Sequence, residues 1–134
     1  MRAIQFLQQH PQIRIRVESL RPKIQQVLRG LNFHTDEVVV VFTTNTYISE
    51  LHGRYLGDPS PTDILTFAEK GRVQIVISLD QAKKQAQERK ISLNQEVLLL
   101  VLHGLLHYVG HDDLNRQEWC CMKQKEFEWI AKLL

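Results

Sequence analysis

Residues 97–113 read Val-Leu-Leu-Leu-Val-Leu-His-Gly-Leu-Leu-His-Tyr-Val-Gly-His-Asp-Asp. A helix over the first part of this stretch would carry leucine and valine on nearly all of its sides, a pattern typical of a helix buried at the centre of a domain. We expect a central helix that begins at a cap, Ser92 or Asn94, and ends near Val109. Ser92 and Gln95 have the spacing of a capping box, in which each side chain bonds the other's backbone. Histidines on such a helix are expected to be largely enclosed.

Two of those histidines, His103 and His107, are four residues apart and therefore share one face of the helix. Gly110 follows, and glycine is the residue that most readily ends a helix in the left-handed conformation. Three further potential metal ligands come next: His111, Asp112 and Asp113. A segment of this kind can gather three groups around one divalent ion and leave a coordination position open, as catalytic zinc sites do. The pattern predicts a metal-dependent hydrolase.

The two-histidine spacing is also that of the H-E-x-x-H metallopeptidases, whose glutamate is the general base. Gly104 stands at the position of that glutamate. Because the usual base is absent, the sequence argues against a peptidase and favours hydrolysis of another kind of bond.

The rest of the chain alternates short predicted strands and helices. Strands are expected at residues 3–7, 13–17, 38–42, 64–67 and 73–78. Helices are expected at residues 19–30, from 44 or 45 to about 53, 79–89 and 116–133. The lack of alternation in residues 38–42 predicts a strand buried on both faces. This inventory favours an α/β or α+β fold with a small mixed sheet.

Size and composition predict one domain without a membrane span. A chain of 134 residues is long enough to bury roughly 68% of its unfolded surface. Its longest strongly apolar run has six residues, against the roughly 20 that a spanning helix requires. The N-terminus lacks the features of a signal peptide, and the adjacent Cys120 and Cys121 suit a reducing compartment. We expect a cytoplasmic protein.

The net charge of +2 is unevenly distributed. Residues 1–35 hold six arginines and lysines against one glutamate, an excess of five. A basic flank can attract a polyphosphate backbone, although a solvated helix face explains the same composition. The candidates for RNA binding are Arg14, Arg16, Arg21, Lys23 and Arg29.

The motif HGLLHYVGHDD at residues 103–113 resembles the signature H-G-x-x-H-x-x-G-[YH]-D-H of the YbeY family of bacterial endoribonucleases and ribosomal-RNA maturation factors. Residues 51–67, LHGRYLGDPSPTDILTF, are similar to that family's L-N-x-x-Y-[RL]-G-x-D-x-P-T-D-V-L-S-F block. Residues 73–78, VQIVIS, match its G-D-I-x-I-S strand imperfectly. The resemblance runs from about Val38 to the C-terminus.

This resemblance implies a compact α+β fold, with a mixed sheet of about four strands, and a zinc ion held by three histidines spaced H-x3-H-x5-H. The first two are His103 and His107, but the third position is Asp113. A carboxylate oxygen is a competent zinc ligand, although this more anionic site could favour manganese or another divalent ion. His111 is the alternative third ligand, and Asp112 is expected to orient a neighbouring ligand from outside the coordination sphere.

A second departure concerns the arginine that many members carry after the loop tyrosine. Leu56 stands at that position, so the arginine's role does not transfer. Arg54 could replace it only if the loop turns its side chain toward the site, and the alternative is a surface arginine. Thr62 and Asp63 are expected to fix the loop and the following strand.

The function implied by the resemblance is single-strand-specific RNA cleavage by metal-activated water, at the 3′ end of small-subunit ribosomal RNA and in ribosome quality control. Its expected partners are ribosomal RNA, the small ribosomal subunit and ribosome-associated proteins, without a membrane. Further cations that could track the RNA backbone are Lys83, Lys84, Arg89 and Lys90. The alternative is a ribosome-assembly factor with a mainly structural metal and weak or absent cleavage.

Overall fold

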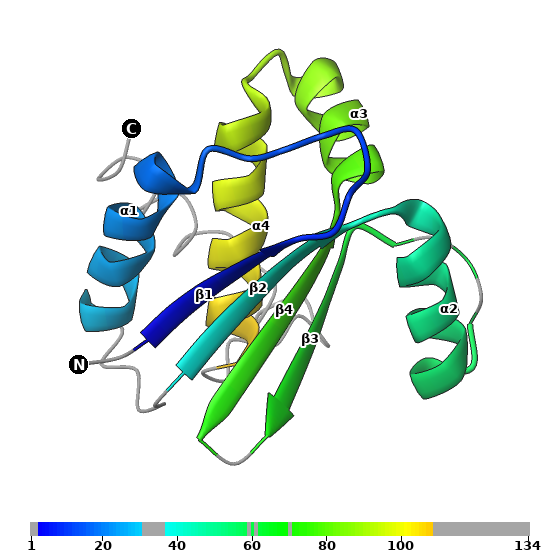
Figure 1. Ribbon diagram of the computed structural model, residues 1–134, viewed down its shortest axis with the longest axis horizontal. Helices are drawn as coiled ribbons and strands as arrows, with labels where there is room; N and C mark the ends of the chain where they lie inside the picture. The colour runs from blue at the N-terminus through cyan, green and yellow to red at the C-terminus, as the bar shows by residue number, and fades with distance from the viewer. Residues whose placement is uncertain (1–2, 31–36, 59, 61, 70, 109–134) are drawn as a thin grey trace, which may run out of the picture.

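A four-stranded mixed sheet in the order β1-β2-β4-β3 forms the centre of the computed structural model (Figure 1). Its strands are β1 (Ala3–Gln8), β2 (Glu37–Thr43), β3 (Ile64–Glu69) and β4 (Arg72–Ser78). β1 and β4 both pair with β2 in parallel, and β3 pairs antiparallel with β4. The structure describes residues 3–30, 37–58, 60, 62–69 and 71–108.

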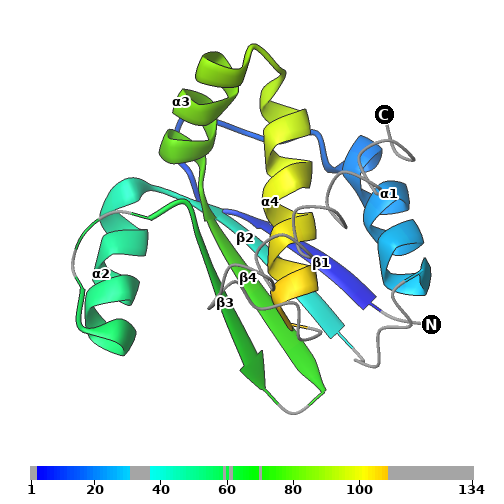
Figure 2. The same ribbon diagram turned by 180° about the vertical axis from the view of Figure 1, so that it is seen from behind.

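The described helices lie on both faces of this sheet. They are α1 (Val17–Gly30), α2 (Asn45–Leu56), α3 (Leu79–Arg89) and α4 (Leu93–Tyr108). One core joins α1, α3 and α4 to the inward residues of the strands, and a smaller one joins α2 to the opposite face. Figure 2 shows α4 lying across the sheet with α1 beside it. The α+β class and the small mixed sheet are therefore confirmed.

Strand β2 has both of its faces in apolar cores, as its lack of alternation predicts. Val38, Val40 and Phe42 belong to the larger core, and Val39 and Val41 to the smaller one. None of these five side chains is more than 3% exposed. Unbroken β-branched sequence in a central strand follows from this double burial.

Helix α4 has the most buried residues of the four described helices, as the apolar sequence before His103 predicts. Nine of its sixteen residues are buried. The expected capping box is present: the Gln95 backbone N–H donates to Ser92 Oγ over 3.1 Å, and the Ser92 N–H donates to Gln95 Oε1 over 3.0 Å. These bonds satisfy donors that the first helical turn leaves without partners, so the start of α4 is fixed.

The predicted strand at residues 13–17 is wrong, because residues 13–16 form a loop and Val17 is the first residue of α1. Ile15 is buried at 4% exposure, which accounts for the alternating pattern. Its backbone pairs with the side chain of Gln8 rather than with another strand: Gln8 Nε2 donates to the Ile15 carbonyl, and the Ile15 N–H donates to Gln8 Oε1. The side-chain amide of Gln8 thus makes the hydrogen bonds with Ile15 that a neighbouring strand would otherwise make.

Two helix boundaries also differ from the prediction. Helix α1 begins at Val17, before the expected cap at Ser19. Helix α2 continues to Leu56 and ends at Gly57, whose φ of 74° is left-handed, rather than near Gly53. Thr44 caps α2 as expected by accepting a hydrogen bond from the Tyr47 N–H.

Among the residues that the structure describes, no helix combines the length and apolar character of a membrane span. The predicted helix at residues 116–133 and the cysteine pair lie outside the described residues.

Candidate functional site

The last two turns of α4 bring His103 and His107 side by side. The centroids of their rings are 6.4 Å apart, and the ring planes are inclined by 67°. This arrangement follows from the i, i+4 spacing, which places both rings on one face of the helix. The two imidazoles can therefore act on the same bound group.

A shared metal ion fits this pair after a small side-chain adjustment. Metal–nitrogen bonds of about 2.0–2.1 Å at tetrahedral angles would bring two ring centres to about 5 Å from each other. The observed 6.4 Å is longer, so the two side chains would have to move somewhat closer to share one ion. The donor set, two neutral imidazole nitrogens, suits zinc and other borderline divalent ions.

The two histidines are less enclosed than the sequence predicts. His103 is half-buried and His107 is exposed, although the leucines and valines around them are buried. The last buried residues of α4 are Leu105 and Leu106. The ring of His107, in the final turn, is therefore exposed to solvent. An accessible pair is the arrangement that an open, substrate-binding metal site requires.

Gly104 lets this end of α4 approach the sheet closely. A Cβ atom at this position would lie 3.1 Å from Thr66 Oγ1 and 3.2 Å from Ile64 Cδ1, closer than ordinary van der Waals contact. A larger residue here would require the side chains of Thr66 and Ile64 on β3 to shift. The close packing thus favours glycine over the peptidase glutamate at this position, and it fixes the backbone next to His103.

The predicted third ligand, Asp113, its alternative His111 and the supporting Asp112 lie outside the described residues. Within the described ranges, no group of three or more histidine, cysteine or carboxylate side chains is placed to hold a metal. The choice between Asp113 and His111 stays a prediction.

Asp63 fixes the start of β3, as expected for the loop at residues 57–63. Its backbone carbonyl accepts a hydrogen bond of 3.0 Å from the Ser78 N–H. Its carboxylate oxygen Oδ2 accepts one of 3.2 Å from Gln85 Nε2 on α3. Thr62, the neighbouring residue of the motif, is half-buried. These bonds tie the loop to β4 and α3.

A buried carboxylate, Glu96, lies in the first turn of α4. Its side chain is fully buried, and Arg89 Nη1 lies 3.1 Å from one of its oxygens and donates to the other over 3.2 Å. Burial raises the pKa of the Glu96 carboxyl, the charge of Arg89 opposes this rise, and the charge of Asp63 adds to it. Arg89, a predicted RNA contact, therefore pairs with a core carboxylate.

Arg54 lies in the last turn of α2, exposed to solvent. Leu56, at the position where many family members carry arginine, is 65% exposed. Because α2 packs on the opposite face of the sheet from α4, the fold does not by itself turn Arg54 toward the histidines. A catalytic role for Arg54 stays a prediction.

The five basic candidates of the N-terminal flank are in different environments. Arg14 and Arg16 are exposed on the loop before α1, Lys23 is half-buried on α1, and Arg29 is exposed in its last turn. Arg21 is used within the fold: its Nη1 donates to the Ile4 carbonyl, and its guanidinium lies 5.0 Å from the centre of the Phe6 ring. Arg14 and Arg16 are the better placed for a ligand.

A buried histidine that the sequence does not predict as a site residue pairs with a carboxylate at the carboxyl ends of the parallel strands. His10 Nε2 lies 2.9 Å from Asp80 Oδ1, and Asp80 Oδ2 accepts from the Asn45 N–H. Because Asp80 belongs to α3 and His10 follows β1, no local spacing in the sequence relates them.

The family model described as Endoribonuclease YbeY matches residues 4–134. The chain belongs to the YbeY family. Its relatives include proteins named Endoribonuclease YbeY from Syntrophus aciditrophicus, 32% identical with 94% of this chain and 86% of the relative covered, and from Pelotomaculum thermopropionicum, 35% identical with 81% and 80% covered. A third, from Thermus thermophilus, is 34% identical with 77% and 81% covered.

A solved structure supports the same fold. The solution structure of TM1509 from Thermotoga maritima superposes with a TM-score of 0.69 and 24% sequence identity, covering 97% of this chain and 88% of that one. The mixed sheet with helices on both faces is therefore an architecture that has also been solved in another protein.

Proposed function

We propose that this protein is a metal-dependent, single-strand-specific endoribonuclease that acts in ribosomal-RNA maturation. Its membership of a family whose relatives are named endoribonucleases supports the RNA-cleaving activity. The single structural observation that carries the metal dependence is the pair of adjacent imidazoles on the last two turns of α4.

His103 and His107 would hold the metal through one nitrogen each, with Asp113 or His111 completing the set. A divalent ion there supplies a Lewis acid and an activated water for phosphodiester hydrolysis. The close packing of Gly104 against β3 would fix the backbone that carries both rings. The exposure of His107 would leave room for an RNA strand to approach.

The alternative, a ribosome-assembly factor with a structural metal, is less well supported. Structural zinc sites are closed, with four protein ligands and no open position, whereas His107 is exposed. We therefore place catalysis first, with small-subunit ribosomal RNA as the expected substrate. Action at its 3′ end, ribosome quality control and a cytoplasmic site of action belong to the same proposal.

The test is cleavage of a labelled single-stranded RNA by purified protein, after metal removal with a chelator and after return of zinc or manganese. We expect cleavage only when metal is present, and much slower cleavage of the same RNA in a duplex.

The His103→Ala/His107→Ala variant should lose cleavage, and Arg54→Ala should show whether Arg54 contributes. Undiminished cleavage by the chelated protein would contradict the proposal. Tight binding to the small ribosomal subunit without any metal-dependent cleavage would favour the assembly factor.

A further inference from the structure

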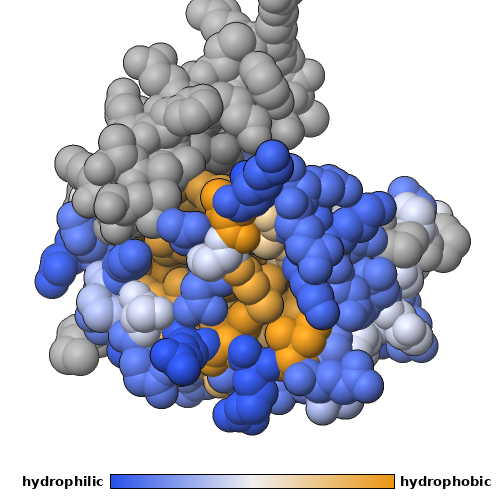
Figure 3. Space-filling view, turned by 90° about the horizontal axis from the view of Figure 1, so that it is seen from above, coloured by the Kyte–Doolittle hydropathy of each residue, from blue (hydrophilic) through white to orange (hydrophobic). Residues whose placement is uncertain are grey.

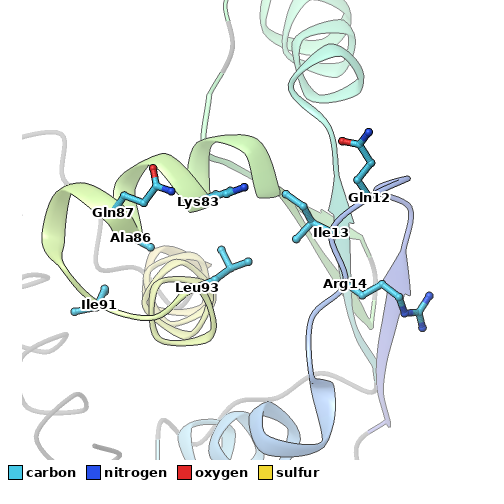
Figure 4. Close-up of a pocket in the computed structure, with 8 residues that line it drawn as sticks. All are labelled: Gln12, Ile13, Arg14, Lys83, Ala86, Gln87, Ile91 and Leu93. Atoms are coloured by element: carbon cyan, nitrogen blue, oxygen red, sulfur yellow. The ribbon is translucent and has the colours of Figure 1, made fainter.

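A pocket of about 470 Å³ opens at the end of the molecule opposite the histidines. One wall is the loop between β1 and α1, and the other is α3 with the turn that leads into α4 (Figure 4). Its volume is within the range of about 300–1,000 Å³ that is typical of ligand sites.

The floor of this pocket is aliphatic. It is formed by Ile13, Ala86, Ile91 and Leu93. Figure 3, which looks down onto this end of the molecule, shows apolar residues flanked by hydrophilic ones. Such a floor offers van der Waals contact to a flat apolar group without requiring a hydrogen-bond partner.

The rim is cationic and polar. Lys83 and Arg14 line it together with Gln12 and Gln87, and no acidic side chain is among the lining residues. In Figure 4, Lys83 extends from α3 across the pocket toward Ile13, and Arg14 extends outward from the opposite edge. The rim therefore presents the charge of Lys83 at the mouth of the pocket, and Arg14 carries a second positive charge just outside it, where an anionic chain would leave the pocket.

Asp80 is an acidic residue one helical turn before Lys83, so its charge bears on how strongly the rim attracts an anion. Burial tends to raise the pKa of its carboxyl, but hydrogen bonds from Asn45 and His10 and the charge of Lys83 hold this pKa below its ordinary value. Both of its oxygens already accept hydrogen bonds. Asp80 is therefore held as a carboxylate within the fold, and its charge offsets part of the positive charge of Lys83 at the rim.

The wall that carries Arg14 is held in place by His10. The backbone N–H groups of Gln12 and Ile13 both donate to His10 Nδ1, over 3.1 and 3.0 Å. Nδ1 therefore accepts both backbone hydrogen bonds, and Nε2 faces the carboxylate of Asp80. A preformed wall of this kind lowers the entropy cost of binding.

We propose that this pocket is a second RNA-binding site, which holds the backbone of a single strand whose other part lies at the histidines. This inference rests on the proposed function for the identity of the anion. Phosphates would contact Lys83 and Arg14, and a base or ribose would cover the aliphatic floor. The Arg14 guanidinium can also stack on a base.

The dimensions of α4 suit this arrangement. Leu93 and His107 are fourteen residues apart, which is about 21 Å along the axis and about 40° short of four full turns. His107 therefore lies on nearly the same side of the helix as Leu93, and His103, ten residues from Leu93, is rotated from it by about 80°. At about 3.4 Å per nucleotide in a stacked strand, some six nucleotides would connect the pocket floor and His107. Strands much shorter than this cannot occupy both places.

The test compares two double variants that remove the same charge. Arg14→Gln/Lys83→Gln removes the rim cations, and the matched control Arg16→Gln/Lys84→Gln removes exposed cations from the same loop and helix outside the pocket. Binding of a fluorescent oligouridylate of about 12 nucleotides, twice the connecting length, is measured by anisotropy over a range of salt concentrations. A chelator prevents cleavage during the titration, and thermal unfolding confirms that each variant folds.

We expect the rim variant to bind about tenfold more weakly near 0.15 M salt and to flatten the slope of log K against log salt by about 1.4, which corresponds to two lost phosphate contacts. The control removes two candidate backbone contacts that lie outside the pocket, so it should weaken binding by a clearly smaller factor than the rim variant does. Cleavage of an RNA of about three nucleotides, too short to reach the pocket, should be equal in the unmodified protein and both variants.

Equal weakening in both variants would overturn the proposal, because net charge alone would then explain binding. Unchanged binding in the rim variant would overturn it as well, as would displacement of the RNA by polyglutamate at equal charge, which would assign the pocket to an acidic protein segment.

If the rim variant loses binding while the unmodified, metal-loaded protein cleaves no RNA, the proposed function fails and the RNA contact stands. If the unmodified protein cleaves RNA while the rim variant binds it unchanged, the second site fails and the proposed function stands.

Discussion

At its N-terminal end α4 is held by a capping box and a buried carboxylate, whereas at its C-terminal end two histidines extend from a buried helix toward solvent. The first end contains Ser92 and Gln95, which bond each other, and Glu96, which accepts a hydrogen bond from Arg89 at one carboxylate oxygen. The second contains Gly104, which packs directly on β3, and the rings of His103 and His107. One helix thus combines an end that anchors it with an end that presents reactive groups.

The largest effect is expected at the C-terminal end, for Gly104→Glu. This change introduces the glutamate of the peptidase pattern where a Cβ would already lie 3.1 Å from Thr66 Oγ1. Overpacking together with a buried carboxylate should lower the free energy of unfolding by about 3 kcal/mol or more, as measured by urea denaturation.

The matched control is Gly104→Ala. Its helix propensity is better by about 1 kcal/mol, which offsets part of the crowding, so its stability should stay within about 1 kcal/mol of the original. A Gly104→Glu variant that is equally stable would show that α4 and β3 are not in the close contact described.

The next largest effect is expected at the N-terminal end, for Arg89→Ala. Losing one partner of a fully buried ion pair costs about 3–5 kcal/mol. Because the side chain of Arg89 is 55% exposed, and because Glu96 can take up a proton, we expect a loss of about 1–2 kcal/mol. A double-mutant cycle with Glu96→Gln should recover part of this loss, and strictly additive effects would disprove the pairing.

A smaller effect is expected for the cap, Ser92→Ala. Loss of an N-cap side chain costs about 1 kcal/mol, and the same variant removes half of the capping box. Thermal unfolding should record this loss, while metal binding and RNA cleavage under folded conditions stay unchanged. A large loss of cleavage in the folded variant would show that the two ends of α4 are coupled more strongly than the comparison implies.

The smallest effect concerns the pH dependence contributed by Glu96. Burial raises the pKa of this carboxyl above its ordinary value of 4.5, so the folded protein binds the proton more tightly than the unfolded chain. The stability contributed by this group is then fully present below pH 4.5 and is lost as the pH rises through the folded pKa. Glu96→Gln should gain stability relative to the original protein as the pH rises above 4.5, and a difference that is constant with pH would contradict this account.

Much of the fold could be predicted from local sequence patterns. The apolar run before His103, the capping box at Ser92 and the unbroken valines of β2 each correspond to a described element. Residues 13–17 could not be predicted correctly, because the alternation of Ile13 and Ile15 reflects burial against the core and not strand pairing. The side-chain amide of Gln8, which replaces the ladder, gives no signal in the sequence.

The candidate site could be predicted in part. The i, i+4 spacing correctly places His103 beside His107, but the exposure of His107 depends on where the apolar surface of α4 ends in three dimensions. The packing reason for Gly104 depends on β3, about forty residues earlier in the chain. The pocket walls likewise come from segments about seventy residues apart, brought together by His10 and Asp80.

Metal binding by α4 is the central claim, and titration of metal-free protein with zinc tests it most directly. We predict one ion bound per chain, and for His107→Ala an affinity loss of more than the 10- to 100-fold that removal of a merely supporting residue costs. The His103→Ala/His107→Ala variant should bind no ion at the same concentrations while keeping its thermal unfolding transition. Stoichiometric, equally tight binding by that folded double variant would contradict the account.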